Sequence, residues 1–276
     1  MSAIDANAAE KEDRLRAIVR ELGSCIVAFS GGVDSALMLT VAGQELGGRA
    51  IGITARSESL AEREYGAALE FAAQIEARHE VVETDEVRRP EYAANPANRC
   101  YYCKSELYGR LRAIALERGF EWIVDGYNRD DDGDWRPGRA AAREYGVRSP
   151  LHEAGFGKGD VRELARRLDL SVWDKPALAC LSSRFPYGTP ITLELLRQVD
   201  RAEQAVLDAG IPVCRVRHHG EVARLEVPLD YVALATEPGR RARIMAGVRA
   251  AGYRYVALDL GGYVSGNLNG AESVRR

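Results

Sequence analysis

The segment that most constrains the fold is Ser30-Gly31-Gly32-Val33-Asp34-Ser35, which directly follows the apolar run of residues 25–29. A short apolar run bounded by a serine and two glycines predicts a buried strand. The apolar spacing after the glycines predicts a helix over residues 36–46, beginning near Asp34 or Ser35. The sequence therefore predicts a buried strand that turns through two glycines into a helix.

A turn of this kind is suited to bind an anion. The backbone N–H groups at the helix start and the helix dipole point to one place, where phosphate is the natural ligand. Gly31 and Gly32 allow positive φ and close backbone approach, while Ser30 and Ser35 add hydroxyl donors. Asp34 can cap the helix or help to hold a magnesium ion. The alternative is that the glycines form only a tight turn and that Asp34 is only an N-cap.

The rest of the first half alternates between helix and strand patterns. Apolar spacing predicts further helices over 9–22, 60–78, 105–118 and 160–168, and apolar runs predict strands over 50–54, 80–83 and 122–124. This alternation is typical of a parallel α/β sheet, at whose carboxyl edge Ser30, Thr54 and Asp125 would lie.

A proline-containing segment without periodicity, residues 174–190, separates this half from the rest of the chain. We therefore expect two domains, 1–185 and 186–276. The second domain should be small and of the α+β class. Its expected helices cover 193–209 and 240–251, and its expected strands cover 213–217, 222–227 and 253–260.

Composition narrows the class of function. The 276 residues are 46% hydrophobic, which suits a globular protein with a full core. The 38 basic and 41 acidic residues give a net charge of −3, so there is no basic field to hold nucleic acid. Residues 1–13 lack the apolar core of an export signal, and no segment resembles a membrane span, so we expect a cytoplasmic protein.

The five cysteines are Cys25, Cys100, Cys103, Cys180 and Cys214. An odd number in a chain without an export signal favours metal, cluster or thiol chemistry over disulfides. Cys100 and Cys103 have CxxC spacing near a helix start, whose dipole would lower their pKa, and Cys180 lies in the proline-containing segment. With no fourth ligand at zinc spacing nearby, the three suit an open iron–sulfur cluster with one iron free for sulfide. Alternatively, the CxxC residues are a buried or redox pair; Cys25 and Cys214 should be core residues.

Taken together, several motifs resemble one family of the PP-loop superfamily. The chain is similar to the ATP-dependent sulfur transferases that build the nickel-pincer nucleotide cofactor of lactate racemase. The resemblance covers nearly the whole chain. It is carried by SGGVDSALM, NRCYYCKSELY, DGYN with the DxRPG-like residues 134–138, ACLSSRFPYGTPIT and VRHHGEVARLEV, together with Lys158 and Lys175-Pro176.

The resemblance implies a fold and a reaction. The fold is that of PP-loop (adenine nucleotide alpha hydrolase-like) domains, a parallel sheet with helices on both faces, plus a small C-terminal α+β domain. Such enzymes use ATP to adenylylate a carboxylate of pyridinium-3,5-biscarboxylic acid mononucleotide, release pyrophosphate and form a thiocarboxylate. The sulfur comes either from one cysteine matching Cys180, which becomes dehydroalanine, or from sulfide relayed by a three-cysteine [4Fe-4S] cluster. Since all three cysteines are present, this chain resembles the cluster type, which needs a sulfide source and forms a homo-oligomer such as a hexamer.

The expected site residues come from the motifs of the resemblance and from the positions at the carboxyl edge of the expected sheet. We expect ATP and Mg²⁺ to be bound by Ser30, Gly31, Gly32, Val33, Asp34, Ser35, Thr54, Asp125 and Gly126, the cluster by Cys100, Cys103 and Cys180, and catalysis to involve Cys180, Asp34 and Arg184. Arg215 and Arg217 share one strand face, which suits the substrate phosphate, although an exposed charged face is the alternative. His218 and His219 are expected to be turn residues.

Three other functions remain possible from the sequence. A tRNA thiolase of the same superfamily is disfavoured by the near-neutral charge and the lack of an added RNA-binding module. An amide-forming ligase would need no cysteine triad. A nucleotide sensor would bind ATP without releasing pyrophosphate, although the motif suits cleavage between the α and β phosphates.

Overall fold

The computed structural model describes residues 3–133, 137–176 and 179–264. The chain packs into two compact units. The first comprises Met1–Ser57, Glu62–Glu86 and Asn98–Leu178, and the second comprises Glu58–Ala61, Val87–Ala97 and Ala179–Arg276. The change of unit at residue 179 lies shortly before the expected domain border at 185. Two short segments of the first half also belong to the second unit, a feature that periodicity along the sequence does not reveal.

The first unit is built on a four-stranded parallel sheet with the order β3-β2-β1-β4. Its strands are β1 (Cys25–Ala28), β2 (Ala50–Arg56), β3 (His79–Glu83) and β4 (Trp122–Val124). Its helices are α1 (Ala3–Glu21), α2 (Val33–Leu46), α3 (Glu62–Gln74), α5 (Arg99–Arg118), α6 (Gly138–Glu144), α7 (Pro150–Glu153) and α8 (Lys158–Arg167). Parallel strands need crossover connections, which explains the alternation of helix and strand in the sequence. The expected α/β class with a parallel sheet between helices is confirmed.

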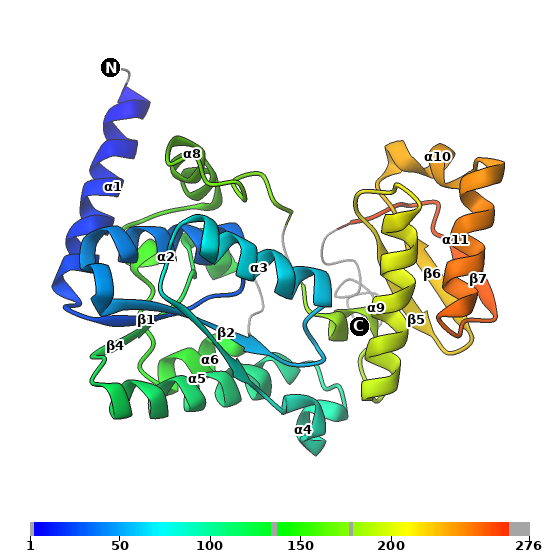
Figure 1. Ribbon diagram of the computed structural model, residues 1–276, viewed down its shortest axis with the longest axis horizontal. Coiled ribbons are helices and arrows are strands. Elements are labelled where there is room, and N and C mark those ends of the chain that lie inside the picture. The colour runs from blue at the N-terminus through cyan, green and yellow to red at the C-terminus, as the bar shows by residue number, and fades with distance from the viewer. Residues whose placement is uncertain (1–2, 134–136, 177–178, 265–276) are drawn as a thin grey trace. The chain divides into compact units, whose positions relative to one another are not determined.

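Helices cover both faces of this sheet (Figure 1). Successive residues of β1 point to opposite faces, so Val27 packs with α1, α2, α3 and α8, while Ile26 packs with α5 and α6. All residues of β1 are buried because it lies inside the sheet with both faces covered. The carboxyl end of β1 leads directly into the glycine-containing turn.

The second unit contains a three-stranded sheet with the order β5-β6-β7. Strand β5 (Arg215–His219) pairs antiparallel with β6 (Val222–Glu226), and β6 pairs parallel with β7 (Tyr255–Leu258). The helices are α4 (Pro90–Ala93), α9 (Leu193–Asp208), α10 (Val232–Thr236) and α11 (Pro238–Ala250). The buried stripe of α9 contains the apolar residues Leu196, Val199, Ala202 and Val206, but also Glu203. A charged residue at such a position needs a partner, which is described below.

Short 3₁₀ turns complete both units: η1 (Gly47–Arg49), η2 (Glu86–Arg88), η3 (Arg129–Gly133), η4 (Leu181–Arg184) and η5 (Leu229–Tyr231). The sequence did not reveal these turns or the short helices α4, α6, α7 and α10, because segments of this length carry little periodicity. None of the helices in the described part of the chain combines the length and the apolar character that a membrane span needs.

Candidate functional site

The turn after β1 depends on glycine at one of its two glycine positions. Gly31 has φ +74°, and a Cβ there would lie 2.9 Å from the Cβ of Ala68, so both backbone and space demand glycine. Gly32 has φ −81° and serves as the N-cap of α2, which begins at Val33. Of the two glycines that allow positive φ, only Gly31 adopts it.

Hydrogen bonds of the two serines close this loop. The Ser35 hydroxyl accepts from the backbone N–H of Ser30 at 3.2 Å and donates to the carbonyl oxygen of Gly32 at 3.0 Å. The two hydroxyl oxygens of Ser30 and Ser35 are 3.1 Å apart. Ser35 is buried, whereas Ser30 is exposed. Ser35 thus shapes the loop, and Ser30 presents a hydroxyl to solvent.

Asp34 is not a helix cap, because it is the second residue of α2 and Gly32 occupies the N-cap position. Its carboxylate is held by two residues from distant parts of the chain. The Nζ of Lys158 lies 2.5 Å from Oδ2, and the Nδ2 of the buried Asn128 donates to Oδ1 at 3.1 Å. The interpretation of Asp34 as only an N-cap is therefore wrong.

Lys175 contacts the same loop from a segment beyond α8. Its Nζ donates to the carbonyl oxygen of Gly31 at 3.3 Å and lies 3.1 Å from a carboxylate oxygen of Glu64. Lys158 and Lys175 thus bring two positive charges to a loop suited to phosphate. The expected site residues did not include them. Both belong to motifs of the resemblance, which was the available signal, but local spacing does not tell which part of the fold they reach.

The end of β4 packs directly against the loop. A Cβ on Gly126 would lie 2.7 Å from the backbone nitrogen of Ser35 and 2.9 Å from the carbonyl carbon of Asp34. The neighbouring Asp125 carboxylate accepts from Ser149 Oγ at 2.7 Å and from the Tyr108 hydroxyl at 3.3 Å. Gly126 is therefore part of the loop surroundings, whereas the Asp125 side chain joins α5 and α7 to the sheet edge. Its nucleotide contact stays a prediction.

The Thr54 side chain is also engaged within the protein. Thr54 is 1% exposed, and its hydroxyl donates to the carbonyl oxygen of Phe29 at 2.9 Å. The same oxygen lies 2.9 Å from Nε2 of His79. Burial lowers the pKa of His79 below its ordinary value. These bonds link β2 to β3 and to the residue that follows β1. A direct bond from this buried hydroxyl to a nucleotide would require them to rearrange.

Exposure separates the five cysteines into two groups. Cys25 and Cys214 are buried core residues, as expected, and burial raises the pKa of Cys25 to about 12. Cys100 is exposed and Cys103 partly buried, and both lie within the first two turns of α5, which begins earlier than expected. A spacing of three places them on the same helix side.

Cys180 is exposed and belongs to the second unit, whereas Cys100 and Cys103 belong to the first. The described residues contain no group of three Cys, His, Asp or Glu side chains arranged to hold a metal ion. The expected trio therefore draws its thiols from both units. Thiols near the start of a long helix suit an iron–sulfur cluster chemically, since thiolate is the ligand that such clusters use.

The backbone around Cys180 is fixed by the buried Arg184. Its Nη1 donates to the carbonyl oxygens of Ala179 at 2.8 Å and Cys180 at 3.0 Å. Its Nε and Nη2 donate to the two carboxylate oxygens of Glu203 at 2.8 and 2.9 Å. Burial opposes the charge of Arg184, but the attraction and hydrogen bonds of Glu203 outweigh burial and raise its pKa. These bonds indicate a positioning role; the expected catalytic role stays a prediction.

Arg215 and Arg217 are 8% and 5% exposed, so the alternative of an exposed charged strand face is wrong. Arg217 donates to one carboxylate oxygen of Glu226 at 2.7 and 2.9 Å and to the carbonyl oxygen of Ser183 at 2.9 Å. The Arg215 guanidinium lies 5.1 Å from the centre of the Tyr263 ring. Burial, with the nearby charge of Arg184, lowers the pKa of Arg215. Their role toward a substrate phosphate stays a prediction.

The two histidines beside these arginines are not turn residues. His218 and His219 end β5, and the turn consists of Gly220 and Glu221, with Gly220 at φ +62°. His218 is buried, and its Nδ1 lies 3.0 Å from the Tyr253 hydroxyl. Two consecutive histidines before a glycine resemble a turn locally, and only tertiary packing shows that His218 is a core residue.

Comparison with known proteins gives long matches. No protein-family model matches the chain. It is 38% identical over 269 residues to the pyridinium-3,5-bisthiocarboxylic acid mononucleotide synthase of Lactiplantibacillus plantarum, covering 96% of this chain and 95% of that protein. It is 45% identical over 259 residues to an uncharacterized Synechocystis protein, covering 94% of this chain and 97% of the relative. A Methanocaldococcus jannaschii protein, also uncharacterized, is 27% identical over 235 residues, covering 85% of this chain and 88% of the relative.

Proposed function

Because the chain belongs to the family of pyridinium-3,5-bisthiocarboxylic acid mononucleotide synthases, we propose that it is an ATP-dependent sulfurtransferase. Its substrate is pyridinium-3,5-biscarboxylic acid mononucleotide, one carboxylate of which becomes a thiocarboxylate. The observation that carries the proposal is the loop of residues 30–35. It combines a left-handed Gly31, the start of α2 and an acidic side chain at the carboxyl end of an inner parallel strand.

The reaction has two steps in which atoms and charge balance. A carboxylate oxygen of the substrate attacks the α-phosphorus of ATP, the bond to the bridging α–β oxygen breaks, and pyrophosphate leaves. Hydrosulfide then attacks the acyl carbon, the bond to the AMP oxygen breaks, and a proton is released with AMP. Adenylylation is needed because a carboxylate oxygen is otherwise a poor leaving group.

Residues of the first unit would serve the first step. The backbone N–H groups at the start of α2 and the Ser30 hydroxyl bind the pyrophosphate portion. The ammonium groups of Lys158 and Lys175 stabilise the charge that develops on pyrophosphate as it departs. Asp34 holds magnesium, since carboxylate oxygen is a ligand that this ion prefers.

Cysteines would serve the second step. Cys100, Cys103 and Cys180 would hold a [4Fe-4S] cluster, which when bound supplies an iron that binds sulfide. Arg184 positions the backbone of Cys180 through its carbonyl oxygen. In the alternative version, Cys180 itself loses its sulfur and becomes dehydroalanine, and no cluster is needed.

Anaerobic reconstitution with iron and sulfide tests the proposal. We expect wild type to bind about four irons, to absorb near 400 nm and to form AMP and pyrophosphate when substrate is added. Cys100→Ala, Cys103→Ala and Cys180→Ala should each lose iron, whereas Cys25→Ala, which changes a core thiol, should keep it.

The results of this experiment distinguish the cluster version of the reaction from the version with a sacrificial cysteine. If the protein binds no iron and its mass falls by one H₂S during turnover, the sulfur comes from Cys180 itself and no cluster is involved. Absence of AMP formation with the pyridinium substrate, in protein that binds ATP, would refute the sulfurtransferase proposal itself.

A further inference from the structure

Both carboxylate oxygens of Asp34 have a partner within the protein. Asn128 donates to one oxygen, and the Lys158 ammonium lies 2.5 Å from the other. The side chains of Asp34 and Lys158 are 23% and 33% exposed. The Asp34 carboxylate, which would hold magnesium, is thus already neutralised by the Lys158 ammonium.

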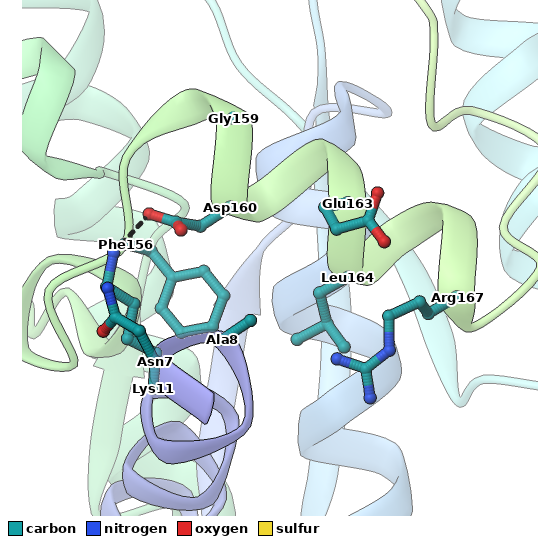
Figure 2. A pocket seen from close by; sticks show the side chains of 9 residues that line it. All are labelled: Asn7, Ala8, Lys11, Phe156, Gly159, Asp160, Glu163, Leu164 and Arg167. Carbon is teal, nitrogen blue, oxygen red and sulfur yellow. Dashed lines mark hydrogen bonds and ion pairs between the residues drawn. The ribbon is translucent and has the colours of Figure 1, made fainter. Parts of the chain in front are cut away.

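The backbone of Lys158 is fixed, although its side chain ends in a partly exposed ion pair. It is the first residue of α8, and its N–H donates to Asp130 Oδ2 at 2.7 Å. The preceding N–H of Gly157 donates to Asp160 Oδ2 at 2.8 Å. Asp160 is also paired at 2.7 Å with Lys11 of α1 (Figure 2). The start of α8 is therefore held, and the ammonium can change partners by side-chain rotation alone.

This pair weakens the site for magnesium on its own. A carboxylate that is paired with an ammonium is a poorer ligand for a hard cation, which usually binds through one or two carboxylates together with phosphate oxygens. An ion pair with a third of its cation exposed contributes only about 0–1 kcal/mol, so a stronger anion can displace it. A nucleotide phosphate at the start of α2 would be such an anion.

We propose that Lys158 exchanges partners when nucleotide binds, which rests on the proposed function for the location of ATP. Before nucleotide binds, it neutralises Asp34 and weakens the binding of magnesium alone. When ATP enters with magnesium, the ammonium transfers to a phosphate oxygen and Asp34 binds the metal. Lys158 is thus the residue that makes metal binding depend on nucleotide.

Lys175 shows the same arrangement on another side of the loop. Its ammonium lies between the carbonyl oxygen of Gly31 and the carboxylate of Glu64. This ammonium, too, is neutralised by a carboxylate of the first unit. Its partner Glu64 is not expected to bind magnesium, so only the Lys158 pair should control the metal.

The test is a pair of binding measurements on Lys158→Met, made by calorimetry with Mg²⁺ alone and with magnesium and α,β-methylene-ATP. Loss of the ammonium frees Asp34, so we expect binding of Mg²⁺ alone to tighten, by up to about fivefold. We expect binding of the nucleotide analogue to weaken roughly tenfold or more, because a hydrogen bond to a charged group is lost. A purely structural role would not move the two affinities in opposite directions.

Matched variants sharpen the result. Lys11→Met removes another lysine–carboxylate pair of α8 and should leave both affinities unchanged. Lys158→Arg keeps the charge, so the affinity for Mg²⁺ alone should stay as weak as in wild type. The proposal is overturned if Lys158→Met leaves Mg²⁺ binding unchanged or weaker, or leaves nucleotide binding unchanged. If Lys158→Met shifts the two affinities in opposite directions but the wild type forms no AMP, only the proposed function is refuted.

Discussion

Gly126 offers a direct test of the loop geometry. In Gly126→Ala, the added Cβ would lie 2.7 Å from the backbone nitrogen of Ser35 and 3.0 Å from Cβ of Asp34. Ordinary contacts begin at 3.4 Å, so the start of α2 would have to move by several tenths of an ångström. The neighbouring atoms belong mostly to backbone and cannot rotate away. Overpacking of this kind destabilises proteins by about 1–3 kcal/mol.

The same displacement should weaken ATP binding, because it moves the backbone N–H groups at the start of α2. Misaligning one hydrogen bond to a charged phosphate, a bond that contributes about 1.5–3 kcal/mol, corresponds to roughly tenfold or more in affinity. Calorimetric titration with ATP and thermal unfolding measure both effects.

Gly43→Ala is the control, since it lies in the same helix with no atom within 4 Å of its Cβ. It should keep ATP affinity and gain about 0.5–1 kcal/mol of stability. Unchanged affinity and stability in Gly126→Ala would refute the geometry.

Two further predictions concern the second unit. Glu203→Gln leaves the buried Arg184 without an opposite charge, so the free energy of unfolding should fall by roughly 3 kcal/mol or more, and Arg184→Met/Glu203→Leu should regain much of it. Urea denaturation checks this, and a fully stable single variant would contradict it. Burial, with the charge of His219, lowers the pKa of His218. The unfolded chain therefore takes up its proton first, and stability should fall as pH drops below about 6.5. Urea midpoints at about pH 8 and pH 5.5 should differ less in His218→Gln than in wild type; equal differences would argue against the assignment.

Local sequence patterns predicted the strands and the long helices of the first unit. The apolar run before Ser30 and the helical spacing after it sufficed to predict β1 and α2, because a buried inner strand and an amphipathic helix each have a characteristic period. Gly31 was predictable for a similar reason, since its φ of +74° is a local backbone requirement. Element boundaries were less certain: α5 begins at Arg99 and takes in the CxxC residues.

Charged side chains in the second unit show where local patterns fail. Arg215 and Arg217 alternate as an exposed strand face would, yet both are buried. Arg217 is buried because Glu226 on the neighbouring strand neutralises it. Similarly, the sequence did not show that Arg184 is buried and bonds the backbone carbonyl oxygen of Cys180. A sequence window records the charge of a residue but not the partner that permits its burial.

The sequence by itself determined the α/β class and the glycine-containing loop between β1 and α2, because each depends on residues that are close along the chain. Only the tertiary structure decided what surrounds that loop. Lys158 reaches Asp34 from 124 residues away, and Lys175 reaches Gly31 from 144 residues away. Such pairs depend on how α8 and its following segment pack against the sheet, and no periodicity within a single element specifies that packing.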